Sequence, residues 1–302
     1  MKTKEKFDFS NLFVLDLANN HQGDLNHGLE IINQVSKIVK KCKVKSAIKF
    51  QFRNLDDFIH PNFKKIGKDQ QVDRFLSTKL SINQFAKLFD CVKKNDLITM
   101  CTPFDEKSVD EIEEMGFDVI KVASCSANDW PLLEKVSKCN LPIIISTGGL
   151  LLSEIDDIVS FFDHKGCDFA LMHCVSLYPT PDDQFNLDQI EVLRYRYKNI
   201  KVGFSTHEDP NNYLPMAIAV SKGAVMFEKH VGLETDNFKL NKYSSSPQQL
   251  QRWFETYLQA KKICGSSSIR EISLEEKKSL NKLKRGVFLK NKVVSNNYLS
   301  DK

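Results

Sequence analysis

Eight short apolar segments alternate with eight amphipathic segments along residues 12–264 of this 302-residue chain. The apolar segments are nearly continuous in Val, Ile, Leu and Phe, which is typical of parallel strands buried on both faces. We expect strands at Leu12–Leu17, Ser46–Phe52, Leu97–Thr102, Val119–Ala123, Pro142–Ser146, Phe169–Cys174, Ile200–Ser205 and Val225–His230. We expect helices at Leu29–Val39, Ser81–Lys94, Asp105–Gly116, Trp130–Ser137, Ser153–Phe162, Asn186–Tyr195, Tyr213–Lys222 and Pro247–Ile263. This alternation indicates an α/β fold built on a parallel sheet.

The positions of polar residues favour a closed barrel over an open doubly wound sheet, although both folds fit the alternation. Nearly every expected strand ends with a polar side chain that is able to do chemistry. These side chains are Asp16, Lys49, Gln51, Thr102, Lys121, Ser124, Ser146, His173, Ser205, His207, Glu228 and His230. A TIM barrel gathers such groups at the carboxyl ends of its strands, whereas an open sheet concentrates them at one switch point. We therefore predict a (β/α)8 TIM barrel.

The alternation of apolar and amphipathic segments ends at about residue 265. Residues 1–265 are expected to form the barrel, and residues 266–302 a short C-terminal extension. The extension begins with a serine-rich linker, has one predicted helix at Leu274–Leu283, and ends in a charged segment. No nucleotide-binding glycine loop and no solenoid repeat occur in the sequence.

Charge, cysteine content and hydropathy exclude several classes of protein. The formal net charge is +4, from 43 basic and 39 acidic residues, and the lysines are scattered, so nucleic acid is not an expected partner. The eight cysteines form no CxxC pair, which favours reduced thiols in the cytoplasm over a zinc site or a disulfide framework. The first apolar run breaks at Asp16, too early for a signal peptide, and we expect no membrane partner. We expect a cytoplasmic protein.

Two of the expected strands end close to a histidine. The stretches VGFSTHEDP and FEKHV place His207 and His230 at the ends of the seventh and eighth strands. Neighbouring strand ends direct side chains into one barrel mouth, where two neutral imidazoles suit a divalent first-row metal. Glu228 precedes His230 by two residues and either supports the metal ligands or is a polar residue of a lower layer.

Two lysines lie within expected strands, where an ammonium group needs an anionic partner. Lys49 in AIKFQFR and Lys121 in VIKVASCS admit two chemistries. Either lysine could form a Schiff base, or the pair could clamp a ligand that bears two anionic groups. Four hydroxyl side chains at neighbouring strand ends add donors that oxyanions require, and they are Thr102, Ser124, Ser146 and Ser205. A metal, two lysines and these hydroxyls fit a phosphorylated carboxylate better than a neutral sugar.

Several motifs in this order resemble the sialic acid synthase (N-acetylneuraminate synthase) family. The similarity runs from about Leu12 to Ile263, and its motifs are NNHQGDLNHGLEII, IKFQ, CTPFD, IKVAS, PLLEKV, PIIISTGG, LMHCVSLYPTP, VGFSTHE, FEKHV and YSSSPQQL. The family condenses phosphoenolpyruvate with an amino-sugar aldehyde. The resemblance therefore implies a 2-keto-3-deoxy sugar acid as product, made for surface polysaccharide.

The resemblance also implies roles for individual residues. Phosphoenolpyruvate would contact Lys49, Thr102, Lys121, Ser124, Ser146 and Ser205. His207 and His230 would bind Mn²⁺, or another divalent metal such as Mg²⁺ or Co²⁺. Gln51 and Tyr178 match pocket residues of the family, and the implied catalytic residues are Lys49, Lys121, Asp16 and Gln51. The lysines would hold the anionic groups of the substrate without forming a covalent bond.

The departures from the family pattern fall on the sugar side of the pocket. The family usually has Glu at Asp16, an acid at Ser126 and Asn at Ser176. Its late loop usually reads Asp-His-Lys-Ala-Ser, where this chain has Leu240–Ser244 with Asn241 second. We expect Ser126, Ser176 and Asn241 to contact the sugar. A less hydroxylated or differently substituted aldehyde than N-acetylmannosamine is therefore expected.

The C-terminal segment LKRGVFLKNKVV resembles the start of the antifreeze-like domain of the family. We expect residues 266–302 to contain only a stub of that domain, which is too short for a core of its own. Since the family domain completes the site of the partner subunit in a dimer, the resemblance also implies a homodimer.

Two other functions remain open from the residues alone. A Schiff-base aldolase or lyase would use Lys49 or Lys121 as its nucleophile, and borohydride reduction with pyruvate would trap it. A catalytically lapsed barrel would instead bind a sugar phosphate or serve as a scaffold, which the absence of an acid at Ser126 favours.

Overall fold

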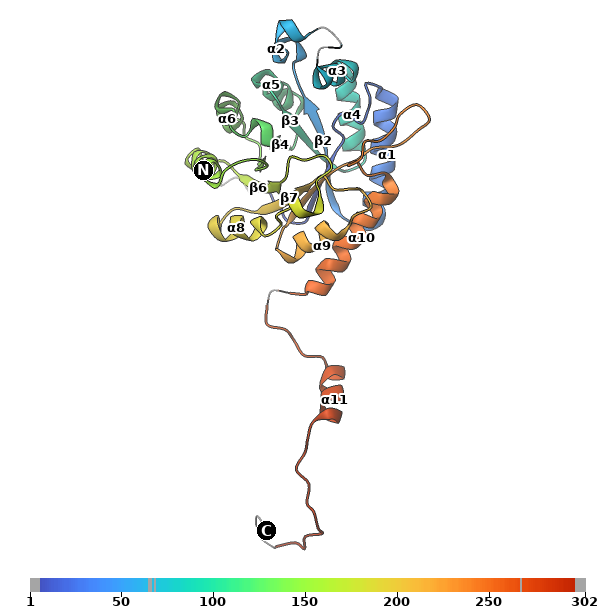
Figure 1. The fold of residues 1–302 in the computed structure, drawn as a ribbon, viewed down its shortest axis with the longest axis vertical. Coiled ribbons are helices and arrows are strands. Elements are labelled where there is room, and N and C mark those ends of the chain that lie inside the picture. The colour runs from blue at the N-terminus through green and yellow to red at the C-terminus, as the bar shows by residue number, and fades with distance from the viewer. Residues whose placement is uncertain (1–5, 65–66, 68, 267, 297–302) are drawn as a thin grey trace. The chain divides into compact units, whose positions relative to one another are not determined.

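The computed structural model describes residues 6–64, 67, 69–266 and 268–296. Eight parallel strands close into a barrel in sequence order, each hydrogen-bonded to the next and β1 to β8 (Figure 1). The strands are β1 (Leu12–Asp16), β2 (Lys45–Phe52), β3 (Ile98–Pro103), β4 (Val119–Val122), β5 (Ile143–Ser146), β6 (Phe169–Cys174), β7 (Val202–Thr206) and β8 (Met226–His230). The predicted TIM barrel is confirmed.

The helices that follow the strands lie around the outside of the barrel (Figure 1). They are α1 (Leu25–Cys42), α4 (Ile82–Lys94), α5 (Glu106–Met115), α6 (Trp130–Ser137), α7 (Leu152–His164), α8 (Gln189–Arg196), α9 (Leu214–Ser221) and α10 (Pro247–Cys264). Local capping explains several boundaries. Ser81 and Gln84 form a capping box at the start of α4, and Gly116, with φ of 77°, ends α5 in the left-handed conformation.

The segment between β2 and α4 has structure that the sequence pattern did not predict. It contains α2 (Leu55–Phe58), the 3-10 helix η1 (Pro61–Phe63) and α3 (Gln70–Ser77). Asp69 starts α3, because its carboxylate accepts hydrogen bonds from the backbone N–H groups of Gln71 and Val72.

Strand alternation divides the core into an outer and an inner layer. In β1, Phe13 and Leu15 face the helices, whereas Leu12 and Val14 face the barrel interior. The inner apolar cluster is made of Phe9, Leu12, Val14, Ala47, Met100, Val119, Ile144, Ala170, Met172 and Met226. The strand register then pairs Asp16 with both Lys49 and His230. Apolar residues therefore fill the lower barrel, and polar residues occupy its carboxyl end.

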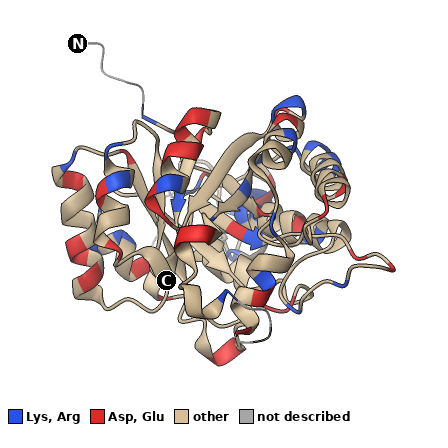
Figure 2. Cartoon of the chain, turned by 90° about the horizontal axis from the view of Figure 1, so that it is seen from above, with Lys and Arg blue, Asp and Glu red and all other residues tan. Residues whose placement is uncertain are grey.

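The chain divides into two compact units, Met1–Ile263 and Cys264–Lys302. The second unit contains α11 (Leu274–Leu283), and every described residue of this unit is exposed. Among the described residues, no helix combines the length and the apolar character needed to span a membrane. Acidic and basic residues are interleaved over the outer helices, and further basic residues lie inside the barrel (Figure 2).

Candidate active site

A cavity of about 530 Å³ lies at the carboxyl ends of the strands. Its wall contains residues from most of the eight strands and the loops that follow them, as a TIM-barrel active site does. The lining residues that carry polar or aromatic side chains are Asp16, Asn19, Lys49, Gln51, Arg53, Gln71, Arg74, Phe75, Phe104, Lys121, Ser124, Cys125, Ser146, Cys174, Ser176, Tyr178, Ser205, His207, Glu228, His230 and Tyr243.

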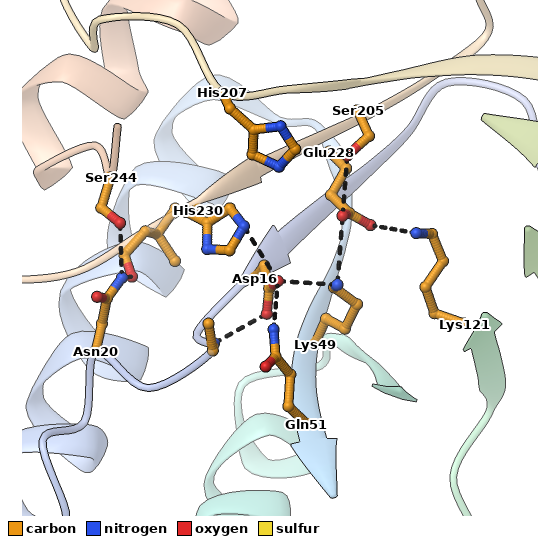
Figure 3. Close-up of polar contacts among 12 residues, drawn as sticks. Asp16, Asn20, Lys49, Gln51, Lys121, Ser205, His207, Glu228, His230 and Ser244 are labelled. Atoms are coloured by element: carbon orange, nitrogen blue, oxygen red, sulfur yellow. Dashed lines mark hydrogen bonds and ion pairs between the residues drawn. The ribbon is translucent and has the colours of Figure 1, made fainter. Parts of the chain in front are cut away.

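Glu228 links the two buried lysines at the floor of this cavity (Figure 3). Its Oε1 lies 3.3 Å from Lys49 Nζ, and its Oε2 lies 3.4 Å from Lys121 Nζ. Ser205 Oγ also donates to Glu228 Oε1, at 3.1 Å. Burial opposes ionisation of the carboxyl group, but the charges of the two lysines outweigh it and lower the pKa of Glu228 to about 2.

Asp16 forms the second carboxylate of the floor. Its Oδ2 lies 2.9 Å from Lys49 Nζ and accepts a hydrogen bond from Gln51 Nε2 at 3.1 Å. Burial would raise the pKa of Asp16, but the charge of Lys49 is among the opposing effects that hold it below its ordinary value. The same pairing acts on Lys49, because burial would lower its pKa and the two carboxylates raise it. Lys49 is therefore a fixed cation.

The pKa of Lys121 is lowered, whereas that of Lys49 is raised. Lys121 donates to Ser146 Oγ at 2.6 Å, and its only carboxylate within ion-pair distance among the described residues is Glu228. Burial lowers the pKa of Lys121 by more than Glu228 raises it. An ammonium group has three N–H donors, and Lys121 donates one hydrogen bond to a described residue, Ser146, so it keeps donors for a ligand.

Hydroxyl groups gather beside Lys121 at the ends of β4 and β5. Ser124 Oγ accepts a hydrogen bond from the backbone N–H of Gly148 at 3.0 Å. A Cβ at Gly148 would lie 2.7 Å from Ser176 Oγ and 2.8 Å from Ser124 Oγ, so a larger residue would displace both hydroxyl groups. Lys121, Ser146, Ser124 and Ser176 thus form a concave group of cation and hydroxyls, which suits an oxyanion.

The two histidines lie side by side on the opposite wall, with ring centroids 5.3 Å apart (Figure 3). His207 Nδ1 is 3.1 Å from the carbonyl oxygen of Val175, and donation there leaves Nε2 with a free lone pair. Burial lowers the pKa of His207 to about 3, and burial also lowers the pKa of His230. Both imidazoles are therefore neutral at neutral pH.

The histidine pair fits a divalent metal held by few protein ligands. Neutral imidazoles are ligands for first-row metals, and Asp16 Oδ2 is 3.5 Å from His230 Nε2. In the described part of the chain, no cluster of three or more His, Cys, Asp or Glu could hold a metal ion. A metal bound by His207 and His230 would leave its remaining positions to water and substrate, and its binding stays a prediction.

An aromatic wall closes the histidine side. Tyr178 packs on His207 with ring centroids 4.3 Å apart, and Tyr243 packs on His230 at 5.2 Å. The two tyrosine rings are themselves 5.2 Å apart. Tyr243 comes from the late loop, which Asn20 anchors by donating to Ser244 Oγ and to the carbonyl oxygen of Val231. Tyr243 was not predicted as a site residue.

The structure brings most of the predicted site residues into this one cavity. They are Asp16, Lys49, Gln51, Lys121, Ser124, Ser146, Ser176, Tyr178, Ser205, His207 and His230. Three predicted substrate-binding residues do not line it. Thr102 and Ser126 are buried, and Asn241 shapes the late loop by accepting hydrogen bonds from the backbone N–H groups of Tyr243 and Ser244. Their contact with substrate stays a prediction.

Side chains alternate in direction along a strand, and this alternation explains why His173 does not line the cavity. His173 was grouped with the strand-end residues, but it is the second-to-last residue of β6 and faces outward. Its Nε2 lies 2.8 Å from the carbonyl oxygen of Phe185, and its ring stacks beside Phe204. His173 is therefore a buried residue of the barrel exterior.

Residues of the unpredicted segment complete the cavity. Arg53 follows β2, and Gln71, Arg74 and Phe75 come from α3. Arg53 Nη2 donates to Gln51 Oε1 at 3.0 Å. The basic residue two positions after the IKFQ motif was a signal in the sequence, whereas the role of α3 depends on how the segment folds over the barrel.

The chain is similar to several known proteins. A sequence model of the NeuB family matches residues 36–268. Protein MJ1065 of Methanocaldococcus jannaschii, which is uncharacterized, is 32% identical over 281 residues, covering 89% of this chain and 79% of its own length. The N,N'-diacetyllegionaminic acid synthase of Campylobacter jejuni is 27% identical over 302 residues, covering 96% of this chain and 88% of its own.

A crystal structure from Chromobacterium violaceum, provisionally assigned as spore coat polysaccharide biosynthesis protein E, is 43% identical with a TM-score of 0.89. It covers 91% of this chain and 82% of that one.

Proposed function

The chain belongs to the NeuB family, and from this premise we propose that it condenses phosphoenolpyruvate with an amino-sugar aldehyde. The product would be a 2-keto-3-deoxy sugar acid for surface polysaccharide. A C. jejuni relative is named as a synthase of such an acid, and the C. violaceum protein is named for polysaccharide biosynthesis. The observation that carries the proposal is one cavity that joins an oxyanion-binding group to a pair of neutral histidines.

The proposed reaction forms one C–C bond and releases phosphate. C3 of phosphoenolpyruvate attacks the aldehyde carbon, water adds to C2 of the resulting cation, and phosphate leaves by cleavage of the C2–O bond. Lys121, Ser146 and Ser124 would hold the phosphate and carboxylate groups. Asp16 and Glu228, which are ionised and buried in the cavity, would stabilise positive charge that develops at C2.

The histidine pair would serve the aldehyde. A divalent cation held by His207 and His230, Mn²⁺ being our first choice, supplies Lewis-acid polarisation of the aldehyde oxygen when bound. The protein positions the two reactants on opposite sides of the Asp16–Lys49–Glu228 network. Holding both reactants in one buried geometry lowers the entropic part of the barrier.

Phosphate release provides the direct test. Purified protein with Mn²⁺ and phosphoenolpyruvate is incubated with a panel of amino-sugar aldehydes, and the products are identified by mass. In H₂¹⁸O, C–O cleavage leaves the released phosphate unlabelled, whereas labelled phosphate would indicate a phosphatase and contradict the proposal. Binding of phosphoenolpyruvate without product from any aldehyde would favour a catalytically lapsed barrel.

Substitutions at Lys121 separate anion binding from Schiff-base chemistry. We expect Lys121→Ala to weaken phosphoenolpyruvate binding far more than Lys121→Arg, because arginine keeps the positive charge but cannot form an imine. Calorimetric titration of both variants measures the difference. Equal losses, together with a borohydride-reduced pyruvate adduct on the native protein, would instead identify a Schiff-base aldolase or lyase, a possibility that the lowered pKa of Lys121 keeps open.

A further inference from the structure

Arg53 lies against two aromatic rings at the edge of the cavity and has no acidic partner among the described residues. Its guanidinium carbon lies 3.6 Å from the ring centroid of Phe104 and 4.3 Å from that of Phe75. One hydrogen bond, to Gln51 Oε1, fixes Nη2, while the buried Nε has no hydrogen-bond partner among the described residues. Burial lowers the pKa of Arg53 to about 10, so the group stays charged at neutral pH.

Arg74 lies close to Arg53 and is unpaired as well. It is on α3, three residues after Gln71 and one before Phe75, and all three side chains line the cavity. In the described part of the chain, no carboxylate lies within ion-pair distance of Arg53 or Arg74. The two guanidinium groups are near enough that the charge of Arg74 also contributes to the lowered pKa of Arg53.

These arginines come from other parts of the chain than the oxyanion-binding group at Lys121. The ends of β4 and β5 carry Lys121 and Ser146, whereas Arg53 follows β2 and Arg74 lies on α3. A row of contacts connects Arg53 to His230. Arg53 contacts Gln51 at 3.0 Å, Gln51 contacts Asp16 at 3.1 Å, and Asp16 is 3.5 Å from His230. A substrate with its aldehyde at His230 would reach the arginines by extending its far end along this row.

We infer that Arg53, Arg74 and Gln71 form a second anion site, which binds a negatively charged group on the sugar aldehyde. This inference rests on the proposed function and specifies its acceptor as an anionic sugar. Planar guanidinium groups bind phosphate and carboxylate in a bidentate manner, and the two phenylalanine rings pre-orient Arg53 for such contact. The charge can be a phosphate ester or a carboxylate, and the experiment distinguishes them.

The test compares three acceptors on the protein saturated with phosphoenolpyruvate and Mn²⁺. The acceptors are N-acetylmannosamine, its 6-phosphate, and the corresponding 6-carboxylate, N-acetylmannosaminuronic acid. We expect one of the two anionic acceptors to bind at least about tenfold more tightly than the neutral sugar, because a charge-assisted hydrogen bond contributes that much. Whichever anion binds more tightly identifies the source of the charge.

Variants assign the effect to the arginines. Arg74 is half-buried, so Arg74→Gln is expected to fold normally, to retain phosphoenolpyruvate affinity, and to lose the preference for the anionic acceptor. Arg53→Lys keeps the charge but loses the planar group between the rings, and we expect it to reduce the preference as well. Lys87→Gln removes one exposed positive charge from α4, outside the cavity, and should leave the preference unchanged.

Three outcomes would overturn the inference, and they can be told apart. If phosphoenolpyruvate binds but the three acceptors bind equally, the second anion site is absent while the proposed function stands. If the native protein does not bind phosphoenolpyruvate at all, the proposed function fails and the inference fails with it. A preference that persists in Arg74→Gln and Arg53→Lys would place the anion elsewhere and also contradict the assignment.

Discussion

Glu228 is the residue on which the floor of the cavity depends. It is buried, and it lies 3.3 Å from Lys49 and 3.4 Å from Lys121. Lys49 has a second carboxylate partner in Asp16, whereas Lys121 has none among the residues described. A buried ammonium group without a counter-charge is costly, so the two lysines depend on Glu228 to different degrees.

We therefore expect Glu228→Gln to destabilise the protein by about 3 kcal/mol or more, since it leaves Lys121 buried without an anionic partner. The pKa of Lys121 should fall further, and phosphoenolpyruvate binding should weaken as pH rises. Urea unfolding and calorimetric titration measure the two effects. Glu234→Gln, which changes an exposed carboxylate, is the control and should change stability by less than about 0.5 kcal/mol. Equal stability of the two variants would contradict this role.

Because of His21, we expect the free energy of unfolding to fall as the pH is lowered. The side chain is buried against Phe85, and burial lowers its pKa from 6.5 to about 4. Between these two values the unfolded chain binds more protons, so stability falls as pH is lowered from about 6.5 towards 4. The full contribution is about 3 kcal/mol.

His21→Asn should flatten this part of the stability curve. The Asn Oδ1 can replace His21 Nδ1 as acceptor for the backbone N–H of Gly23, and it does not titrate in this range. Urea unfolding between pH 4.5 and 7 measures the slope. His60→Asn changes an exposed histidine with a similar backbone contact to Asn62 and is the matched control. An unchanged slope in His21→Asn would show that other groups cause the pH dependence.

At the scale of elements, the close approach of β7 and β8 positions the histidine pair. Gly203 faces the barrel interior, and a Cβ there would lie 2.7 Å from the carbonyl oxygen of Met226 and 2.8 Å from its Cβ. The backbone of β8 cannot yield as a flexible side chain would. The strands that lead to His207 and His230 are therefore packed as closely as glycine allows.

Gly203→Ala should separate these strands. We expect a loss of about 1–3 kcal/mol in the free energy of unfolding, because overpacking in a barrel interior cannot be relieved without moving backbone. Affinity for Mn²⁺ should fall in parallel, since the two imidazoles move apart. Urea unfolding and metal titration test both parts. If only one of the two quantities changed, stability or Mn²⁺ affinity, the packing of β7 against β8 would not be what positions the two histidines, and the prediction would be wrong.

At the scale of the whole molecule, the cavity belongs to the first of the two compact units. All its lining residues fall within Met1–Ile263, and α10 completes that unit. The described residues of the second unit are exposed, so they add little apolar burial of their own.

Removal of residues 265–302 should leave the barrel folded. We expect its thermal midpoint to stay within about 2 °C of the full chain, because exposed residues contribute little to stability. Calorimetry on both chains measures the midpoint, and titration checks whether phosphoenolpyruvate affinity is kept. A large drop in the midpoint would show that the second unit stabilises the first.

The sequence by itself determined the fold class and the inward direction of several site residues. Eight apolar strands with helices between them indicated an α/β fold, the polar strand ends favoured the barrel, and a strand period of two places Lys49 and Gln51 on the same inner face. The caps at Ser81 and Asp105 likewise set their helices through local hydrogen bonds. These features depend on near neighbours in the chain, which is why the pattern revealed them.

Only the tertiary structure decided which strand-end residues meet. His173 and His207 are each near the end of a strand, yet one faces outward and the other lines the cavity. The pairing of Glu228 with two lysines joins three strands, and the enclosure of Arg53 between Phe75 and Phe104 joins three separate segments. Contacts of this kind depend on strand register and on how α3 folds over the barrel. Both are fixed by packing between residues distant in sequence, which no local pattern records.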